Sequence, residues 1–312
     1  MSTFRGTGEP STYVISITPF AKDGSFDEAG VRRHLRRLRD AGIGVYVGGG
    51  GSGEGFAMSA DEHKRLLEIA VDELEGRVPI RAMGTEPRAA SQMIEYVSVA
   101  KSVGVDGAQI YSLDQGHGHQ PFRDEIRTYF TDILDAVDIP SIISTHQSVG
   151  YLIPIDLLDE LVDRYPHVVG INCSTGDMRY LIELIDTVGD RVEIHVGGPF
   201  QALSALSLGA TGYLSSEGNL APRLCVSVID SFTKGDLAVA FDSYARVARL
   251  SRVLYGRGGI RATKAVLNEL GLAGGYPRRP QLEVSAEVVT ELMELVRALD
   301  LATIEGWSTK DA

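Results

Sequence analysis

Eight short runs of apolar and β-branched residues alternate along the chain with longer stretches of helical periodicity. Such runs predict strands, and the spacers between them are long enough to hold the helices that connect parallel strands. The runs cover residues 13–17, 44–47, 79–82, 107–111, 141–144, 168–173, 192–196 and 212–215. Because eight parallel strands close into a barrel, the sequence predicts an α/β protein with a (β/α)8, or TIM, barrel.

The spacers carry signals for helix starts. Residues 25–28 and 59–62 both begin with Ser and end with Glu, which is the spacing of a capping box. In the second of these helices the apolar residues form one stripe, so we expect Glu68, Asp72 and Glu73 on the solvated side.

No strand signal returns after Pro222, and three further helices are predicted, over residues 224–255, 260–270 and 285–299. No Ser/Gly-rich linker separates them from the strands. We therefore predict a barrel over residues 1–222 and a C-terminal helical extension over residues 223–312 that packs on it.

The composition limits the partners of the chain. A net charge of −12 and an isoelectric point near 5.1 disfavour nucleic acid and anionic membranes, because both would repel it. Two cysteines without a pattern favour a reducing compartment, and residues 1–10 lack an apolar signal segment. We expect a cytoplasmic protein that binds a small molecule, without nucleic acid or membrane partners.

The loop after the second run, residues 48–54, is rich in glycine. Glycines allow consecutive backbone N–H groups to face one ligand, so Gly50, Gly51 and Ser52 are candidates for binding a carboxylate. A tight turn explains the same glycines equally well. In a barrel, the loops at the carboxyl ends of the strands build the active site, which places this loop where a site is expected.

Several ordered motifs resemble the dihydrodipicolinate synthase and N-acetylneuraminate lyase superfamily. Residues 17–24 read ITPFAKDG, like the TPF...DG opening of that family, and residues 50–54 take its GTTGE position. Further matches cover residues 76–79, 104–107, 209–215, Asn219, 264–272 and Arg279-Pro280. The resemblance extends over roughly residues 11 to 300.

The resemblance implies a (β/α)8 lyase, usually a tetramer, in which a lysine on the sixth strand forms a Schiff base with a 2-oxo acid. In this chain the sixth strand reads VVGINCSTGD and has Asn172 at the position of that lysine. An amide nitrogen is not a nucleophile, so it cannot form an imine. We expect no cofactor, a small carboxylic acid as substrate, and a homo-oligomer, either tetramer or dimer.

Two more functional positions of the family differ. On the fifth strand Ser144 stands at the position of the acid/base tyrosine and Thr145 at that of an asparagine. In the glycine loop Gly51 and Ser52 replace paired threonines, so one hydroxyl is lost and the carboxylate-binding one is kept. These losses remove one coherent mechanism and leave the loop that binds the carboxylate.

Histidines could replace the acid/base groups that this chain lacks. His146, just past the fifth strand, is a candidate general acid or base, or else a locally bonded loop residue. His195 lies in the seventh strand with its face undecided. His117 and His119, with Asp114, could supply part of the ligand set of a metal ion. A solvated loop is the stronger interpretation, and we predict no metal.

Other candidates have plainer explanations. Cys173 should point away from the barrel interior if Asn172 points inward, which favours a packing role. Ser144 with His146 lacks the motif of a serine hydrolase nucleophile. Glu54 and Asp177 are carboxylates that could equally cap helices.

Three hypotheses follow. The first is a lyase that cleaves an aldol, hydrates or decarboxylates without an imine, with Asn172, Ser144 and His146 catalytic. Its substrate would be bound by Gly50, Gly51, Ser52, Thr145 and Gly197. The second is a catalytically inactive barrel that binds a carboxylate ligand or a protein partner, and the third is a metal-assisted enzyme.

Overall fold

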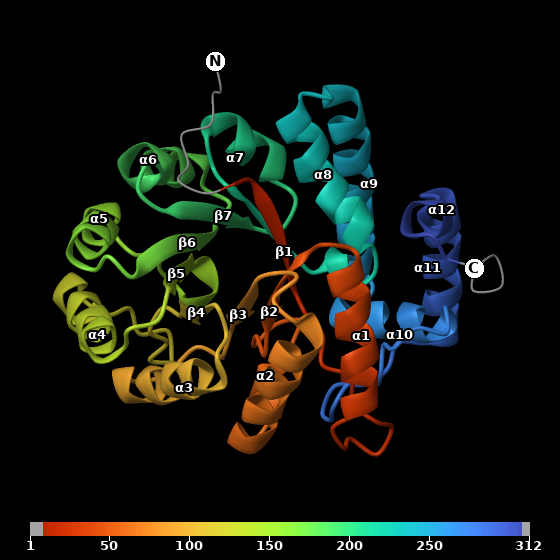
Figure 1. Cartoon of the computed structure of the whole chain (residues 1–312), viewed down its shortest axis with the longest axis horizontal. Coiled ribbons are helices and arrows are strands. Elements are labelled where there is room, and N and C mark those ends of the chain that lie inside the picture. The colour runs from red at the N-terminus through yellow and green to blue at the C-terminus, as the bar shows by residue number, and fades with distance from the viewer. Residues whose placement is uncertain (1–8, 308–312) are drawn as a thin grey trace. The chain divides into compact units, whose positions relative to one another are not determined.

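Eight parallel strands form a closed barrel in the order β1 to β8 (Figure 1), which confirms the predicted (β/α)8 fold. The structure is a computed structural model and describes residues 9–307. Residues 1–8, on which much of the prediction about a signal segment depends, lie outside this range. The strands are β1 (Ser11–Ile15), β2 (Gly44–Val47), β3 (Ile80–Ala82), β4 (Gly107–Ile110), β5 (Ser141–His146), β6 (Val168–Ser174), β7 (Glu193–Gly197) and β8 (Gly212–Ser215).

The chain divides into two compact units. Unit 1 contains residues 81–214 together with the N-terminal residues up to 10, and unit 2 contains residues 11–80 and 215–312. The predicted boundary at residue 222 between barrel and extension stays a prediction. Within the described range, no helix is both long and apolar enough to cross a membrane.

In unit 1, helices lie outside strands β4 to β7 (Figure 1). Each helix buries an apolar stripe, as Leu181, Leu184, Ile185 and Val188 of α6 show. The helices are α3 (Ala90–Val103), α4 (Arg123–Ala136), α5 (Ile155–Arg164), α6 (Met178–Val188) and α7 (Ala202–Leu208).

Unit 2 contains the first two helices and the five C-terminal ones. Helices after the last strand are confirmed, but the single helix predicted over residues 224–255 is wrong, because α8 ends at Lys234 and α9 begins at Leu237. Helices α8 and α9 pack side by side, and α10 contacts α11. The helices are α1 (Glu28–Asp40), α2 (Ala60–Leu74), α8 (Pro222–Lys234), α9 (Leu237–Gly256), α10 (Ile260–Glu269), α11 (Ala286–Ala298) and α12 (Leu301–Glu305).

The two predicted capping boxes have different outcomes. Ser59 caps α2, with its hydroxyl accepting from Glu62 N and the Glu62 carboxylate accepting from Ser59 N, so this prediction is confirmed. The box at residues 25–28 is wrong. Asp27 caps α1 by accepting from Gly30 N at 2.9 Å, because the helix begins only at Glu28.

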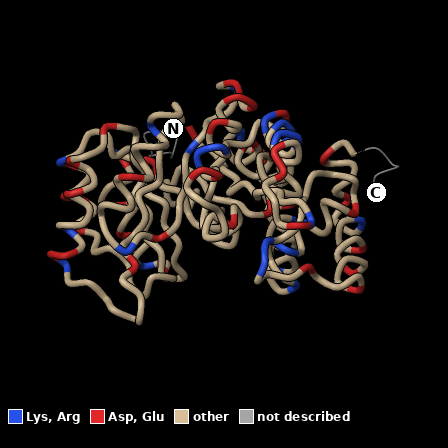
Figure 2. The backbone as a smooth tube through the Cα atoms, turned by 90° about the horizontal axis from the view of Figure 1, so that it is seen from below, with Lys and Arg blue, Asp and Glu red and all other residues tan. Residues whose placement is uncertain are grey.

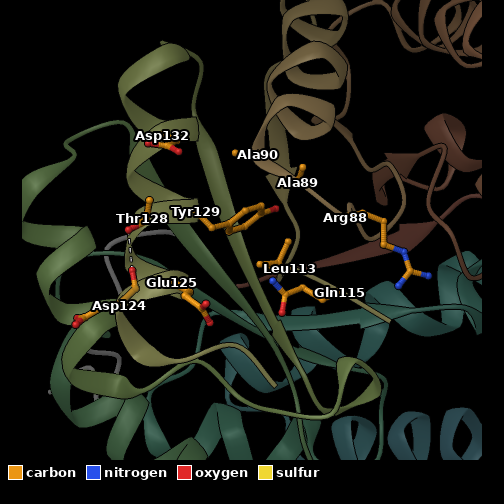
Figure 3. Close-up of a pocket in the computed structure, with 10 residues that line it drawn as sticks. All are labelled: Arg88, Ala89, Ala90, Leu113, Gln115, Asp124, Glu125, Thr128, Tyr129 and Asp132. Atoms are coloured by element: carbon orange, nitrogen blue, oxygen red, sulfur yellow. Dashed lines mark hydrogen bonds between the residues drawn. The ribbon is translucent and has the colours of Figure 1, made fainter. Parts of the chain in front are cut away.

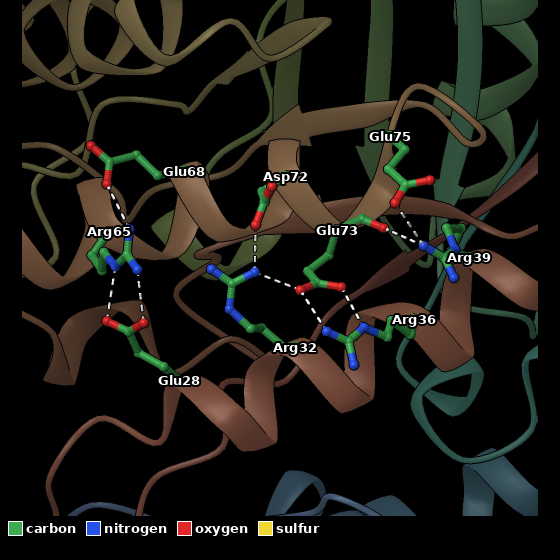
Figure 4. Close-up of polar contacts among 9 residues, drawn as sticks. All are labelled: Glu28, Arg32, Arg36, Arg39, Arg65, Glu68, Asp72, Glu73 and Glu75. Atoms are coloured by element: carbon green, nitrogen blue, oxygen red, sulfur yellow. Dashed lines mark hydrogen bonds and ion pairs between the residues drawn. The ribbon is translucent and has the colours of Figure 1, made fainter.

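Ion pairs join α1 to α2 (Figure 4). Glu73 accepts from Arg36 at 2.9 Å and also pairs with Arg32, while Arg65 bonds to Glu28 at 2.8 Å. The hydrogen bond from Arg36 lowers the pKa of Glu73. Glu73 is buried, so its expected place on the solvated side is wrong: the arginines of α1 cover and neutralise it.

Acidic and basic residues alternate along the chain at many places (Figure 2). Acidic residues outnumber basic ones by 42 to 30, which gives the net charge of −12. Mixed charge of this kind lets most arginines find carboxylate partners, as α1 and α2 show.

Candidate functional site

A row of polar residues crosses β5, β6 and β7 of unit 1. The register pairs Ser144 with Asn172, and Asn172 with His195. Residues opposite one another in parallel strands share a face, so the three side chains point the same way. All three are buried.

The face of this row follows from a fourth residue, Gln109 on β4. The Asn172 amide Nδ2 donates to Gln109 Oε1 at 2.6 Å, although β5 lies between their strands. Side chains two strands apart can meet only on the concave side of a curved sheet. Asn172 therefore faces the barrel interior, as does His195, whose direction the sequence left undecided.

Within the row, His195 is fully buried, and this burial, with a smaller contribution from Arg81, lowers its pKa to about 3. The imidazole is neutral at physiological pH and behaves as a core histidine. One layer nearer the amino ends of the strands, Arg81 pairs with Glu193 at 2.6 Å. The sequence reasoning identified neither this ion pair nor Gln109, because the strand pattern alone does not show which polar residues meet.

His146 ends β5 on the same face as Ser144, two residues further along the strand. Its Nδ1 is hydrogen-bonded to the Ser148 hydroxyl, and its ring contacts Tyr111 edge to face at 5.7 Å. Nε2 has no hydrogen-bond partner among residues 9–307 and lies 3.7 Å from Glu86 Oε1. The ring is therefore positioned by one nitrogen, while the other is buried beside Glu86 without a hydrogen bond.

Two effects oppose each other at His146. Burial lowers its pKa, while the negative charges of Glu86 and Asp114 raise it, and burial is the larger effect. The neutral imidazole is therefore favoured at neutral pH, and it can act as a base. Glu86 is a residue that the sequence reasoning missed, since the loop after β3 carries no motif.

The structure does not bring Thr145 to this face. Its hydroxyl accepts from Ile153 N at 3.0 Å and lies 3.4 Å from the Tyr180 hydroxyl. Its register partner Cys173 is buried, and burial raises the pKa of this thiol to about 12. Such a thiol is not ionised at neutral pH, which fits the packing role expected for Cys173.

Gly197, at the end of β7, leaves room for Ser174 of the neighbouring strand. A Cβ atom at position 197 would overlap the Ser174 hydroxyl. This packing explains the glycine structurally, and a contact from Gly197 to a substrate stays a prediction.

The remaining candidates of unit 1 lie in loops. His117 and His119 are exposed, and Asp114 accepts from Gly116 N at 2.8 Å and pairs with Arg88. Asp177 caps α6 by accepting from Arg179 N at 2.9 Å. Across residues 9–307, no three His, Cys, Asp or Glu side chains gather in a group that could hold a metal ion.

Unit 1 also has a pocket of about 400 Å³ between α4 and the loops after β3 and β4 (Figure 3). Its lining includes Asp124, Glu125 and Asp132 on the α4 side and Arg88 across from them. Its lining does not include Ser144, and none of the other proposed catalytic residues contributes to it.

In unit 2, the glycine loop after β2 folds back on itself. A Cβ atom on Gly53 would lie 2.7 Å from Gly49 N, and Gly48 has a φ of +84°. The Thr18 hydroxyl donates to Gly53 O at 2.7 Å and fixes the turn. The tight turn thus accounts for Gly48 and Gly53, whereas nothing lies within 4 Å of a Cβ placed on Gly51.

Ser52 begins a chain of three hydroxyl groups. Its Oγ lies 2.7 Å from Ser216 Oγ, which lies 3.1 Å from the hydroxyl of Tyr255 on α9. Ser52 and Tyr255 line one cavity of unit 2, with a volume of about 340 Å³. Neither Ser216 nor Tyr255 was identified from the sequence, because both lie far along the chain from Ser52.

Glu54, at the end of the glycine loop, forms a buried ion pair with Lys264 on α10. The Lys264 ammonium also donates to Thr18 O at 2.9 Å and to Tyr276 O at 3.0 Å. Burial lowers the pKa of Lys264, while Glu54 raises it. All the donors of the ammonium are used within the fold, so this pair anchors the loop to the C-terminal helices.

A sequence model of the dihydrodipicolinate synthetase family matches residues 11–299. The chain belongs to the dihydrodipicolinate synthetase family. It is 30% identical over 279 residues to a 4-hydroxy-tetrahydrodipicolinate synthase of Methanopyrus kandleri, covering 89% of this chain and 91% of the relative. A relative of the same name from Hyphomonas neptunium is 32% identical over 270 residues, which are 85% and 89% of the two chains.

Solved structures agree with this membership. Dihydrodipicolinate synthase from Aquifex aeolicus has a TM-score of 0.85 at 26% identity and covers 94% of this chain and 98% of its own. An N-acetylneuraminate lyase from Mycoplasma synoviae shares the fold, with a TM-score of 0.81 at 20% identity over 92% and 97% of the two chains. The resemblance drawn from the ordered motifs is confirmed at the level of the family.

Proposed function

We propose that this family member is a lyase that acts on a small 2-oxo or related carboxylic acid by acid/base chemistry, without a Schiff base. The observation that supports this most is the distribution of amines. Unit 1 contains one lysine, Lys101, which lies exposed on α3 and pairs with Asp138. Where an imine-forming lysine is expected, Asn172 donates to Gln109 instead.

The lysines of unit 2 within residues 11–80 and 215–307 do not offer an alternative amine. Lys22, Lys64 and Lys234 are exposed, and the buried Lys264 is held by Glu54 and two backbone carbonyls. A nucleophilic amine must be deprotonated and free to reach a carbonyl carbon. Lys264 is not free to reach a carbonyl, because all its donors are used, and the other three lysines lie at the exposed surface of unit 2.

The proposed roles follow from the chemistry of each group. The Asn172 amide would donate to an oxygen on which negative charge develops, which is how preorganised donors stabilise an enolate. His146 would remove or return a proton through Nε2, and Ser144 lies between them on the same face. An aldol cleavage, a hydration or a decarboxylation would each use these three groups.

We propose that the substrate carboxylate is bound by Gly50, Gly51 and Ser52, with Thr145 and Gly197 as further binding positions. The unfilled space beside Gly51 and the half-buried hydroxyl chain that starts at Ser52 support the first three. Thr145 would have to act through its backbone, because its hydroxyl has other partners. A homo-oligomer, either dimer or tetramer, and a cytoplasmic location also remain proposals, and light scattering of the purified protein would give the oligomeric state.

Borohydride trapping tests the absence of an imine. The purified chain is incubated with pyruvate and sodium borohydride, and its intact mass is measured beside an enzyme that forms a pyruvate imine. We expect the mass of this chain to stay unchanged while that of the control rises. A pyruvate adduct on any lysine would overturn the proposal.

The proton-transfer role is tested in His146→Gln. We expect kcat for the best 2-oxo acid in a turnover screen to fall roughly 10²- to 10⁴-fold with KM little changed, as for loss of a general acid or base. The matched control is His119→Gln, which changes an exposed loop histidine. An inactive wild type that still binds carboxylates would favour the alternative of a catalytically inactive binding barrel.

A further inference from the structure

The cavity of unit 2 next to Ser52 surrounds the start of helix α10. Gly258, Gly259, Ile260 and Arg261 line it on that side. Helix α10 has no side-chain cap and no acidic residue in its first turn. The N–H groups of Arg261 and Thr263 donate to Gly258 O and Gly259 O, so it is the positive end of the helix dipole that would favour an anion in the cavity.

Arg261 adds a full positive charge to this end of the helix. Its Nε donates to Gly258 O at 3.2 Å, and no carboxylate among residues 9–307 lies within ion-pair distance of it. Its neighbours differ, since Arg257 pairs with Glu291 at 2.8 Å and Arg278 with Glu62 at 2.6 Å. A cation in the first turn of a helix is unfavourable unless an anion lies beside it.

Buried polar oxygens also line the cavity. Gln281 Oε1 has no hydrogen-bond partner within residues 9–307, whereas Glu217, only 1% exposed, interacts with the Ser251 hydroxyl. The other Glu217 oxygen accepts from the Ser215 hydroxyl at 3.0 Å. Burial raises the pKa of Glu217, while its hydrogen bonds to Ser251 and Ser215 lower it, and burial is the larger effect. Buried polar atoms without partners are rare and often mark a ligand or water site.

The hydroxyl chain can serve a separate anionic group. Ser52, Ser216 and Tyr255 hold three protons and use two in the links between them, so one proton is left at one end. An anion beside Ser52 would turn every hydroxyl toward it. Arg261 and the start of α10 would then remain for a second negative charge.

From these contacts we propose that the cavity binds the distal carboxylate of a dicarboxylic 2-oxo acid, with Arg261 as its charge partner. This inference rests on the proposed function, which assigns the first carboxylate to the loop at Ser52. A single guanidinium faces the cavity, and its planar fork matches the two oxygens of one carboxylate. A volume of about 340 Å³ is in the range of small-molecule sites.

Calorimetry with paired ligands tests the inference without requiring turnover. 2-Oxoglutarate and 2-oxopentanoate have equal chain lengths and differ in a terminal carboxylate or methyl group. We expect the wild-type chain to bind 2-oxoglutarate roughly ten- to hundredfold more tightly, the effect of a charge-assisted hydrogen-bond pair. In Arg261→Gln this preference should fall to about threefold or less.

Arg257→Gln is the matched control. It removes the same charge four residues before Arg261, from an exposed ion pair with Glu291, and it should keep the full preference for 2-oxoglutarate. Equal wild-type affinities for the two acids would overturn the inference and leave the proposed function standing. A preference that survives in Arg261→Gln would overturn the assignment to Arg261. Displacement of 2-oxoglutarate by excess inorganic phosphate would overturn the choice of a carboxylate.

Binding of neither acid would contradict the proposed substrate class, and the inference would fail with it. Binding of 2-oxopentanoate alone would contradict the inference and support the proposed function. The failures of the two proposals are therefore distinguishable.

Discussion

Helix α10 has two cations three residues apart that are in opposite situations. Lys264 is 1% exposed, pairs with the buried Glu54 and donates to two backbone carbonyls. Arg261 lines a cavity and donates from Nε to one carbonyl. Two positions one turn apart on one short helix thus hold a charge that the fold has neutralised and a charge that it has not.

The difference separates a structural role from a binding role. A buried charge that has all its partners holds distant segments together, and its loss leaves the partner charge uncompensated. A cation with no counter-ion contributes little to folding and is available to a ligand. If this comparison is right, substitutions of Lys264 and of Arg261 will change the free energy of unfolding by different amounts and in opposite directions.

The largest effect is expected for Lys264→Met. The substitution leaves Glu54 buried without its cation, which typically costs about 3–5 kcal/mol. Urea unfolding followed by circular dichroism would measure the loss. The double variant Lys264→Met/Glu54→Gln removes both charges and should recover much of the stability; a double variant as unstable as the single one would show that the charge of Glu54 is not the cause.

This ion pair shows why part of the structure could not be read from the sequence. Glu54 and Lys264 are 210 positions apart, and neither belongs to a local pattern that names the other. From the sequence, Glu54 was a candidate carboxylate or helix cap, and its role in fixing the loop emerged only from the fold.

The barrel, in contrast, was predictable because its signals are local. Eight runs with strand composition and intervening amphipathic stripes are enough to indicate eight alternating units. The errors have two causes. Asp27 competes locally with Ser25 for the cap of α1, whereas Glu73 looks solvated in the sequence because the arginines that cover it lie on α1. Such contacts between neighbouring helices depend on tertiary packing.

The candidate site was predictable in its position but incompletely in its members. The family resemblance identified Asn172 and Ser144, and the end of the fifth strand identified His146; these three share one face of unit 1. The same reasoning missed Gln109, because residue pairing across a strand depends on barrel curvature. Arg261 was missed because an arginine in an amphipathic helix looks ordinary until its partners are known.

The second prediction concerns Glu62 and Arg278, another neutralised pair beside α10. The hydrogen bond from Arg278 lowers the pKa of Glu62 to about 2, from 4.5. A depressed carboxyl pKa adds stability above about pH 4.5, and this contribution disappears as the pH falls toward 2. We expect Glu62→Gln to lose about 1–3 kcal/mol at neutral pH and to match the wild type near pH 2, in urea unfolding over that range.

The exposed Glu283→Gln carries the same change of charge and should follow the wild type at every pH. A constant difference between Glu62→Gln and the wild type down to pH 2 would contradict the assigned pKa. Arg278 and Lys264 both lie over the Phe20 ring, at 4.1 and 4.8 Å from its centre, so the two neutralised ion pairs share one aromatic neighbour.

The third prediction concerns the cavity of unit 2 and uses the substitution Tyr255→Phe. The substitution removes the terminal proton of the hydroxyl chain and keeps the ring. We expect the affinity for a 2-oxo acid to fall by about three- to tenfold, the value of one neutral hydrogen bond, with the free energy of unfolding almost unchanged. Ser216→Ala should cause a similar loss, and the double variant should lose less than the sum of the two, because both act on one chain. Additive losses in calorimetry would show that the hydroxyls act independently.

The smallest effect, and the one of opposite sign, is expected for Arg261→Met in the ligand-free protein. Removing an unpaired cation from the first turn of α10 relieves its repulsion with the helix dipole, so the free energy of unfolding should stay constant or rise by less than about 1 kcal/mol. Urea unfolding beside Lys264→Met gives the comparison directly, since both replace a long cation on the same helix with the same apolar side chain. If Arg261→Met lost as much stability as Lys264→Met, both charges would stabilise the fold, and the distinction between a structural Lys264 and a ligand-binding Arg261 would not hold.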